Sequence, residues 1–542
     1  MATGMVTDMA MARERSVTGV SFVRTKPVNL AGRPLAAVIA ASLLSFQAQG
    51  QEGDAGGGRP AWLIVPRVSI TETITDNGAL SQGTRGKQGD QITQVSPGVQ
   101  IQGQSGRARG YLDYSLNQIV YAQESGQNQT QNALTAFGTL EAVEKWLFVD
   151  ATGSISQTAI SAFGAQSSSN TSINSNSTET STFRLSPYIK GQLLSFADYQ
   201  VRYDRVASRS QSNLASDSDS EAWTASLNGN TPLSSLGWSL SGSRQTVDYT
   251  LGRKTEADRF YGMLIWQVSP QFKLKGSGGQ EANNYVSLDK ETKSTHGYGF
   301  DWAPTERTLV SWFRENRFFG DGHQFTFTHR TPLTSWRFTD SRDVTAMNQS
   351  GNVGLGTIYD LVLAMIPATI TDPAQRAARA NELIFLFGLP RNAVVNSNFL
   401  TAQATLARRR ELSFIITGVN NTVTFTASES RQESLSSRTI TLFRDSFSMA
   451  NVIDQRGFGV NWSHRISAMS SLMAGVMKTN TSGSGGRGGD INSNQKSLNV
   501  SFSTRLGPKT GASLGLRRTV FDSDASSGYT ENALTGTLTA QF

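Results

Sequence analysis

The sequence LTAFGTLEAVEKWLFVDATGSI, from Leu134 to Ile155, shows the pattern that repeats through most of this chain. On each side of Glu144-Lys145, side chains of one parity are small or apolar and those of the other parity are largely polar. Successive side chains of a β-strand point to opposite faces, so this alternation predicts two strands that each have one apolar face. The charged dipeptide between them predicts a tight hairpin turn.

The same alternation returns in Phe260–Gly276 and in Leu498–Leu516. Long polar connections, such as Ser161–Thr180 and Thr481–Asn492, alternate with tight ones. Short turns at one end and long loops at the other are typical of bacterial outer-membrane barrels. The pattern predicts an all-β fold, a large antiparallel transmembrane β-barrel of about 22 strands, within a range of about 18 to 24. The tight turns are expected at residues 144–145, 269–270, 303–305, 331–332, 467–468 and 507–508.

The composition agrees with a barrel and excludes other classes. The chain has 542 residues, no cysteine and 51 glycines, and only 37% of its residues are hydrophobic. Without cysteine there is no disulfide scaffold, thiolate metal site or thiol catalysis. Beyond the N-terminus, no apolar run approaches the roughly 18–20 residues that a membrane-spanning helix needs, which excludes a helical membrane protein.

The first 50 residues have the features of a secretory signal peptide. Five basic residues precede the apolar run Leu35–Phe46, and Ala48-Gln49-Gly50 provides the small residues of a cleavage site before Gln51. A membrane anchor is the alternative, but the apolar run is too short for one. The leader contains five basic and two acidic side chains, so the mature chain keeps +4 of the net charge of +7, which does not suggest nucleic-acid binding. We expect a signal peptide at 1–50, a linker at 51–61 and a barrel at 62–542.

The C-terminus and the tryptophans carry two further signals. Leu534, Leu538 and Phe542 share one parity of a last strand that ends on an aromatic residue. That pattern resembles the signal read by the outer-membrane barrel assembly machinery. Tryptophans near the tight turns predict an aromatic girdle, because indole is best solvated at the level of the lipid headgroups. The expected girdle residues are Trp146, Trp238, Trp266, Trp302, Trp336 and Trp462.

Residues 355–389 depart from the strand pattern. Their apolar residues have helical spacing, and Asp372-Pro373 and Gly388-Leu389-Pro390 are a helix start and stop. This helical insertion could plug or cover the lumen, or it could be an extracellular helical hairpin with no gating role. In two other stretches, residues 199–204 and 272–275, parity predicts that four charged side chains face the lumen, where polar residues are expected. They are Arg202, Asp204, Lys273 and Lys275.

The sequence offers little that suggests catalysis. None of the four histidines has metal-ligand spacing, and His329 and His464 lie beside expected turns. Asp217-Ser-Asp219-Ser-Glu221 and Asp522-Ser-Asp524 could hold calcium but lack an EF-hand frame, and solvated acidic loops are the alternative. We expect no enzyme activity, catalytic residue, metal or cofactor.

An ordered series of short segments resembles the PEP-CTERM system-associated outer membrane protein family. The similarity covers nearly all of the mature chain, which departs from the family in its longer Ser- and Asn-rich loops. The matching segments are residues 62–77, 95–99, 148–151, 154–157, 269–274, 281–285, 302–308, 318–320, 329–330 with Trp336, and 462–464.

The resemblance implies a Gram-negative outer-membrane barrel associated with exopolysaccharide production and protein sorting. The resemblance does not establish the molecular activity, and our leading hypothesis is a noncatalytic conduit or accessory with exopolysaccharide and export proteins as partners. A structural anchor or assembly partner for surface polysaccharide, without an open pore, is the alternative. In either case the signal peptide would take the chain across the inner membrane, and the barrel would lie in outer-membrane lipid.

Overall fold

The computed structural model divides the chain into two units, Met1–Gly58 and Arg59–Phe542. The expected signal peptide and linker lie outside the described residues. So does the helical insertion, apart from Arg376, Arg379 and Ala380, whose backbone is helical. The structure describes residues 62–81, 86–167, 169–194, 196–346, 376, 379–380, 399–435, 445–486 and 489–542.

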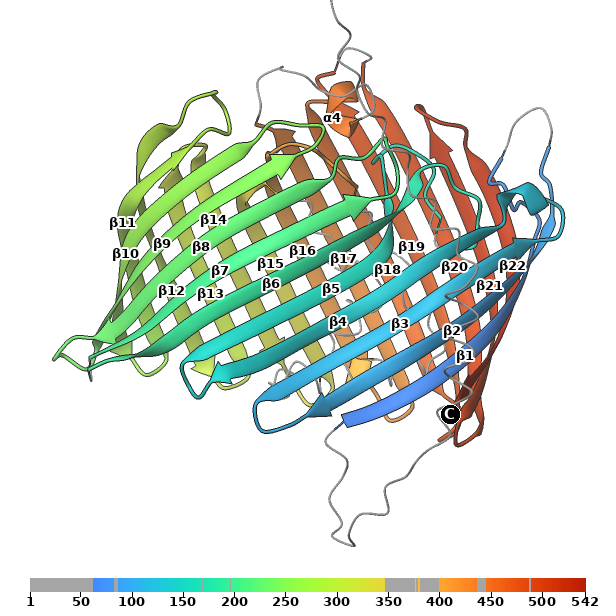
Figure 1. Cartoon of the computed structure of the whole chain (residues 1–542), viewed down its shortest axis with the longest axis horizontal. Coiled ribbons are helices and arrows are strands. Elements are labelled where there is room, and N and C mark those ends of the chain that lie inside the picture. The colour runs from blue at the N-terminus through green and yellow to red at the C-terminus, as the bar shows by residue number, and fades with distance from the viewer. Residues whose placement is uncertain are drawn as a thin grey trace, which may run out of the picture. The chain divides into compact units, whose positions relative to one another are not determined.

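The described residues form 22 antiparallel strands in one sheet, so the strand number predicted from the sequence is confirmed (Figure 1). Each strand pairs with its neighbours in chain order, and β1 (Trp62–Thr75) also pairs with β22 (Tyr529–Gln541), which closes the barrel. The others are β2 (Asp90–Gln104), β3 (Ala108–Tyr121), β4 (Gln129–Val143), β5 (Leu147–Ala159), β6 (Ser177–Leu193), β7 (Ala197–Ser210), β8 (Ser218–Asn230), β9 (Leu236–Tyr249), β10 (Thr255–Ser269) and β11 (Phe272–Asn283). They continue with β12 (Glu291–Thr305), β13 (Thr308–Arg317), β14 (Gly320–Arg330), β15 (Thr334–Thr345), β16 (Thr405–Thr417), β17 (Asn421–Ser434), β18 (Val452–Arg465), β19 (Ser470–Ser484), β20 (Ile491–Gly507) and β21 (Thr510–Ser523).

Helix is scarce in the described part of the chain. A 3-10 turn, η1, spans Ser125–Gln127, and one short helix, α4, spans Ser446–Met449. No helix among the described residues is both long and apolar enough to cross a membrane. The strands have 10 to 17 residues, and a tilted strand needs about 9–11 residues to cross the hydrocarbon core.

Parity sorts the side chains of the wall into an outer and an inner set. In β10, Phe260, Leu264 and Trp266 share one parity and are 52–59% exposed. Antiparallel pairing keeps opposite residues on one face, so the same parity continues into Leu274 of β11 and Trp238 of β9. The outer face is therefore an apolar belt, as a barrel surrounded by lipid requires.

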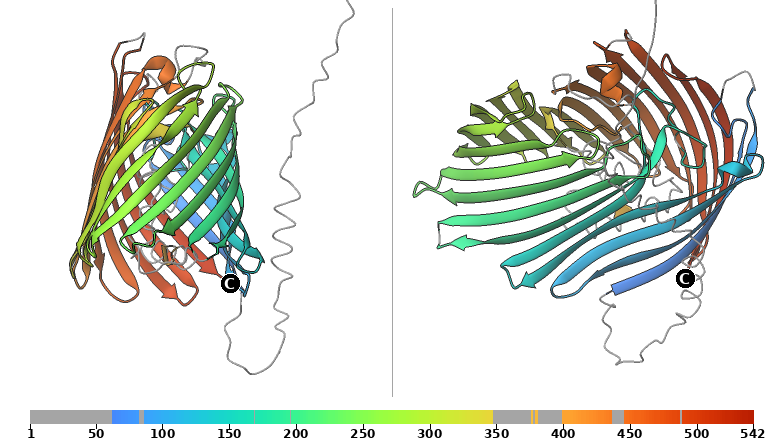
Figure 2. Two further views of the ribbon diagram at one scale, coloured as in Figure 1. Left: turned by 90° about the vertical axis from the view of Figure 1, so that its left-hand side faces the viewer. Right: turned by 45° about the horizontal axis from the view of Figure 1, so that its top comes forward.

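The two ends of the barrel differ in the length of their connections (Figure 2). At one end the strands are joined by turns of two to five residues. At the other end the connections include 160–176 and 435–451. One expected turn is displaced: β12 continues through 303–305, and the turn lies at Glu306-Arg307 after a register irregularity between Trp302 and Thr305. We call the two ends the short-turn end and the long-loop end.

Candidate functional site

Ion pairs on the inner parity of β5, β6 and β7 line part of the lumen. Arg202 lies 2.7 Å from a carboxylate oxygen of Asp150 and 3.8 Å from one of Asp204. Asp204 also lies 2.8 Å from Arg184 and accepts a hydrogen bond from Ser186. Because Asp150 and Arg202 belong to strands that are not neighbours, this pair spans the intervening strand β6 on its inner face. The cluster is a fixed ionic patch on the wall.

Aromatic rings accompany these charges on the same inner face. The rings of Phe148 and Tyr188 are stacked with their centroids 5.2 Å apart. The Lys190 ammonium lies 4.3 Å from the centroid of Phe148, and the Arg202 guanidinium lies 4.2 Å from that of Tyr188. Cations over aromatic faces are attracted by the ring quadrupole. Aromatic rings can pack against the face of a sugar ring. The neighbouring cations can donate hydrogen bonds to its hydroxyl or carboxylate groups.

A second part of the inner wall contains the two lysines predicted to face the lumen. Lys275 lies 2.5 Å from Asp301 of β12. Lys273 is exposed, and no described carboxylate lies within 4.0 Å of its ammonium. The structure thus places Arg202, Asp204 and both lysines on the inner parity of their strands, in two separate groups rather than one site. Their role in transport stays a prediction.

A connection at the long-loop end crosses to distant strands of the barrel. We call residues 160–176, between β5 and β6, the mouth loop; residue 168 lies outside its described part. The Tyr121 hydroxyl donates to the carbonyl of Thr171 at 2.8 Å, and the Ile173 amide donates to the carbonyl of Gly78 at 3.1 Å. On the other side, the Ser523 hydroxyl donates to the carbonyl of Phe163 at 3.0 Å. The mouth loop therefore contacts the last residues of β3 and β21 and the segment that follows β1.

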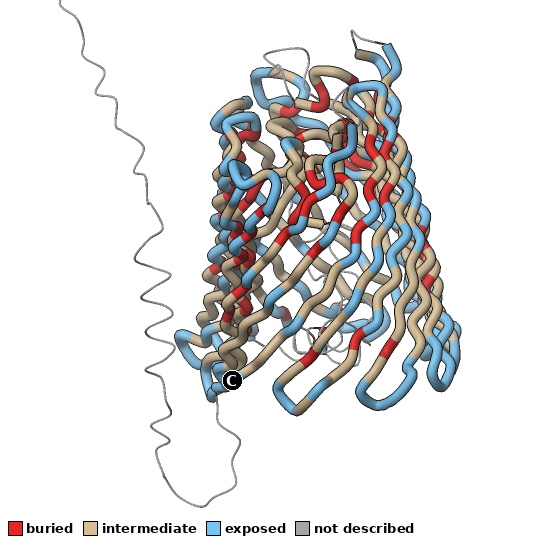
Figure 3. Tube along the Cα trace, turned by 90° about the vertical axis from the view of Figure 1, so that its right-hand side faces the viewer, coloured by how far each residue is buried: buried red, intermediate tan, exposed pale blue. Residues whose placement is uncertain are grey.

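An apolar cluster anchors the mouth loop to the connections of other strands. Phe163 is fully buried, and Phe399 and Phe447 beside it pack with ring centroids 5.9 Å apart. Figure 3 shows buried residues concentrated toward the long-loop end. Burying apolar side chains is favourable, so the cluster holds segments that are distant in sequence together. Its buried members are Ala162, Phe163, Phe399, Phe447, Ala450 and Ile453.

Residues 399–404, just before β16, form a second bridge at this end. The Leu400 amide donates to the carbonyl of Ala159, at the end of β5, at 3.1 Å. Ala404 belongs to a separate buried cluster that includes Tyr249 of β9 and Tyr285. This segment therefore connects two parts of the rim that are distant along the sheet.

Asp445 fixes the start of α4 beside the mouth loop. Its carboxylate accepts hydrogen bonds from the amides of Phe447 at 3.0 Å and Ala402 at 3.3 Å, and from the Thr401 hydroxyl at 3.3 Å. Burial raises the pKa of Asp445 above its ordinary value, although these three donors oppose the shift. Ionisation of Asp445 therefore opposes the packing of residues 445–449 against residues 399–404, which we call the docked state of these loops.

The six predicted girdle tryptophans lie toward the short-turn end. Trp266, Trp302 and Trp462 are each three residues from the last residue of their strand, and Trp238 and Trp336 are each the third residue of theirs. Trp146 lies in a turn, and its indole nitrogen donates to the Tyr199 hydroxyl at 3.1 Å. Trp62, the first residue of β1, lies at the same end, although it was not predicted as a girdle residue.

The C-terminal residues lie in and beside β22. Leu534 and Leu538 are 39% and 49% exposed on its outer parity, opposite Ile74 and Ile70 of β1. Phe542 follows the strand, its ring is 67% exposed, and its amide donates to the carbonyl of Pro66 at 2.9 Å. Their recognition by the assembly machinery stays a prediction.

The histidines and acidic loops have ordinary partners. His329 Nδ1 lies 2.9 Å from the Thr308 hydroxyl, and His464 Nδ1 lies 2.9 Å from the Asn421 side-chain oxygen. The two candidate calcium segments are not loops as expected, because Asp219 and Glu221 lie in β8 and Asp522 lies in β21, and Asp219 is paired with Arg209 at 2.8 Å. Among the described residues, no group of three or more His, Asp or Glu side chains could hold a metal ion.

No family model matches this chain, and no curated protein matches it in sequence. Solved structures resemble it. The FrpB iron transporter from Neisseria meningitidis is 10% identical with a TM-score of 0.49, over 90% of this chain and 83% of the other. The siderophore receptor PirA from Acinetobacter baumannii is 8% identical with a TM-score of 0.47, over 88% and 80%. The outer membrane protein OpdK from Pseudomonas aeruginosa is 8% identical with a TM-score of 0.33, over 88% and 99%. These similarities concern the barrel architecture alone.

Several inner-wall pairs were not predicted from the sequence. Arg67 of β1 pairs with Asp113 of β3 across Gly98, where a Cβ would lie only 3.1 Å from the Arg67 Nε. Arg317 of β13 pairs with Glu281 of β11 at 2.7 Å. In both cases the partners lie two strands apart, and parity alone does not reveal such a pair. Identifying such a pair requires the register of both strand pairings that connect the two partners.

Proposed function

We propose that this protein is an outer-membrane conduit for a hydrophilic solute. Its mouth is controlled by the mouth loop and the other loops packed at the long-loop end. The observation that carries the proposal is the combination of an apolar outer face with an inner face of ion pairs, such as Arg202–Asp150 and Lys275–Asp301. A lipid-facing barrel with a polar lumen is the architecture of water-filled outer-membrane channels.

The resemblance to the PEP-CTERM-associated family extends the proposal to exopolysaccharide. The stacked Phe148 and Tyr188 rings, with Lys190 and Arg202 over them, supply surfaces that suit a hydrated, anionic glycan. In this proposal the barrel reaches the outer membrane through its signal peptide and the assembly machinery. There it would work noncatalytically with export proteins and the sorting system.

Single-channel conductance of the mature chain 51–542 in planar bilayers tests the conduit. The matched variant lacks 355–389, the expected helical insertion. Conductance that rises on deletion means a pore occluded by the insertion and supports export. If both forms stay closed, the conduit proposal fails.

A second candidate function is a structural anchor for surface polysaccharide without an open pore. The observation that favours it is the bridging of the long-loop end by the mouth loop and residues 399–404. An anchor predicts a closed barrel in both proteins of the conductance experiment. It also predicts loss of polysaccharide from the cell surface when the gene is deleted.

A further inference from the structure

Three cations lie close together on the outer face of β19, β20 and β21. Lys478 and Lys496 are directly opposite each other in the register of β19 and β20, and both are exposed. Arg518 of β21 is also exposed, and it lies opposite Leu498, two residues along β20 from Lys496. All three have the outer parity, because their strands expose Val476, Leu498 and Leu516 on the same face.

These cations have no acidic partner in the part of the chain that the structure describes. No described carboxylate lies within 4.0 Å of a side-chain nitrogen of Lys478, Lys496 or Arg518. The Arg518 guanidinium donates a long hydrogen bond of 3.4 Å to the Asn532 side chain. Like charges directly opposite each other on paired strands destabilise a sheet. An anion from outside the chain would remove that repulsion.

The neighbouring stretch of the outer wall is arranged differently. Arg410 of β16 lies 2.8 Å from Glu429 of β17, and Arg456 of β18 lies 3.1 Å from the same carboxylate. Arg431 lies 3.2 Å from Asp454. Outward arginines are therefore neutralised within the chain over β16–β18. On the adjacent strands β19–β21, the three cations are not neutralised in this way.

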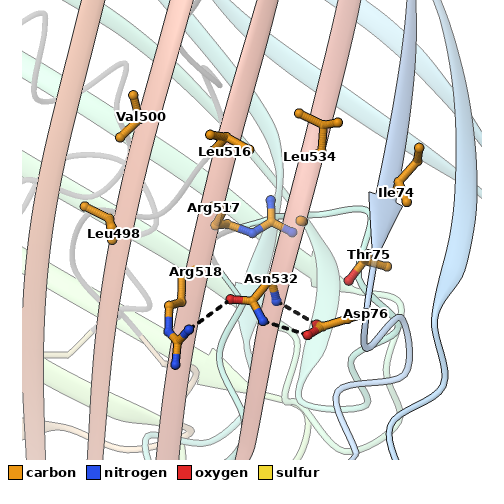
Figure 4. Close-up of a pocket in the computed structure, with 11 residues that line it drawn as sticks. Ile74, Thr75, Asp76, Leu498, Val500, Leu516, Arg517, Arg518, Asn532 and Leu534 are labelled. Atoms are coloured by element: carbon orange, nitrogen blue, oxygen red, sulfur yellow. Dashed lines mark hydrogen bonds between the residues drawn. The ribbon is translucent and has the colours of Figure 1, made fainter.

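A groove in the outer face begins at Arg518, one of the three cations, and runs into the apolar belt (Figure 4). Its volume is about 540 Å³, and its lining passes from Arg518, Asn532 and Asp76 to aliphatic side chains. Toward the long-loop end the outer parity becomes polar, with Asn480 and Asn494. The cations therefore lie at the boundary between the apolar belt and the polar rim. The aliphatic lining is Ile74, Leu498, Val500, Leu516 and Leu534.

We propose that Lys478, Lys496 and Arg518 bind the phosphate of an anionic membrane lipid, with its acyl chains along the groove. Charge-assisted hydrogen bonds from Lys and Arg suit phosphate oxygens, and basic residues at a membrane surface attract anionic lipids. The aliphatic lining matches acyl chains on the apolar side of the same boundary. The site is on the outer wall, so it is independent of what passes through the lumen.

Native mass spectrometry of the mature chain in detergent micelles tests this site. Dioleoyl phosphatidic acid is the probe, and dioleoyl phosphatidylcholine, which has no net charge, is the comparison lipid. We expect K478Q/K496Q/R518Q to bind phosphatidic acid at least tenfold more weakly than the unmodified chain, with phosphatidylcholine binding unchanged.

The matched control is R205Q/R209Q/R244Q. It removes the same charge from the outer parity of β7 and β9, where each arginine has an acidic partner. This variant should bind phosphatidic acid within twofold of the unmodified chain. Equal losses in both triple variants, or no loss in the first, would overturn the proposal. Displacement of the lipid by millimolar inorganic phosphate would overturn the lipid assignment, because it would show a site for free phosphate.

A single variant keeps the test interpretable if the triple variant folds poorly. K496Q removes the repulsion from Lys478, so its Tm in lipid-free detergent should rise above that of the unmodified chain. Phosphatidic acid should then raise the Tm of K496Q by less than it raises that of the unmodified chain. A lipid-induced shift of equal size in both proteins would count against the site. Conductance should be the same in all these variants, which separates this test from that of the conduit.

Discussion

Replacing Phe163 by alanine should release the mouth loop. Phe163 is fully buried in a cluster with Phe399 and Phe447. Truncating a fully buried phenylalanine costs about 3–5 kcal/mol. Since about 1.4 kcal/mol is a tenfold change in an equilibrium constant, the open state of the loop would gain on the order of 100-fold to 4,000-fold in population. The wall itself should be unaffected, because its strand-to-strand hydrogen bonds do not involve this side chain.

Two measurements check the release of the mouth loop. Hydrogen exchange of a peptide covering 160–176 should lose protection in F163A, including the amide of Ile173 that donates to Gly78. Single-channel conductance should rise if this loop restricts the mouth. The control is L288A, in the 284–290 connection, where the side chain is 77% exposed and little packing is lost. Protection and conductance in F163A equal to those of L288A would refute the attachment of the mouth loop through Phe163.

Three further outcomes are expected. Lys273→Gln should shift the reversal potential in a KCl gradient toward cation selectivity, because Lys273 is an exposed inner-wall cation. The control Lys509→Gln, in a short turn, should leave the reversal potential unchanged. Burial raises the pKa of Asp445, so the docked state binds a proton more strongly than the undocked state, and docking should weaken as the pH rises from about 4 through the raised pKa. Channel opening should then increase over that pH range and become independent of pH in D445N. Phe542→Ala should lower the amount of folded barrel in cell membranes without changing refolding into detergent, because its ring is 67% exposed; equal losses in both measurements would contradict a role in assembly.

The wall of the barrel could be predicted from the sequence because its rule is local. Alternation over ten or more residues assigns a side chain such as Lys275 or Trp266 to a face without knowledge of any partner. Loop lengths then assign the two ends. A single bulge is enough to displace a turn, as at 303–305. The alternation of side chains does not reveal where a strand contains an added residue.

The contacts inside the barrel could not be predicted in this way. Arg202 and Asp150 are 52 residues apart, and they meet only because β5, β6 and β7 pair in one register. A shift of one residue in either pairing would move one partner to the outer face. Sequence parity therefore predicts that a charge faces the lumen, but the identity of its partner depends on the whole hairpin geometry.

The mouth loop shows the same limit more strongly. Its Ser- and Asn-rich sequence predicts a solvated loop, and Phe163 is one of few large apolar residues in it. Phe163 is the informative residue, because exposing an aromatic ring to water is unfavourable. A phenylalanine in a polar loop therefore indicates that part of the loop is packed. Its partners lie more than 230 residues away in sequence, at Phe399 and Phe447, so no local pattern identifies them.

The division between wall and loops also determines where this protein can change state. The strand pairs of the wall continue from β1 through β22 and back to β1, so no edge is left at which the sheet could open. Displacing a strand would break two ladders of backbone hydrogen bonds at once. The mouth loop is attached through Phe163, Ala165 and Ile173, which pack against three separate apolar clusters, and through individual hydrogen bonds rather than a continuous ladder. Releasing it should therefore cost less free energy than displacing a strand of the wall. Any gating of this barrel should therefore be sought in the attachments of Phe163 and Asp445 before it is sought in the wall.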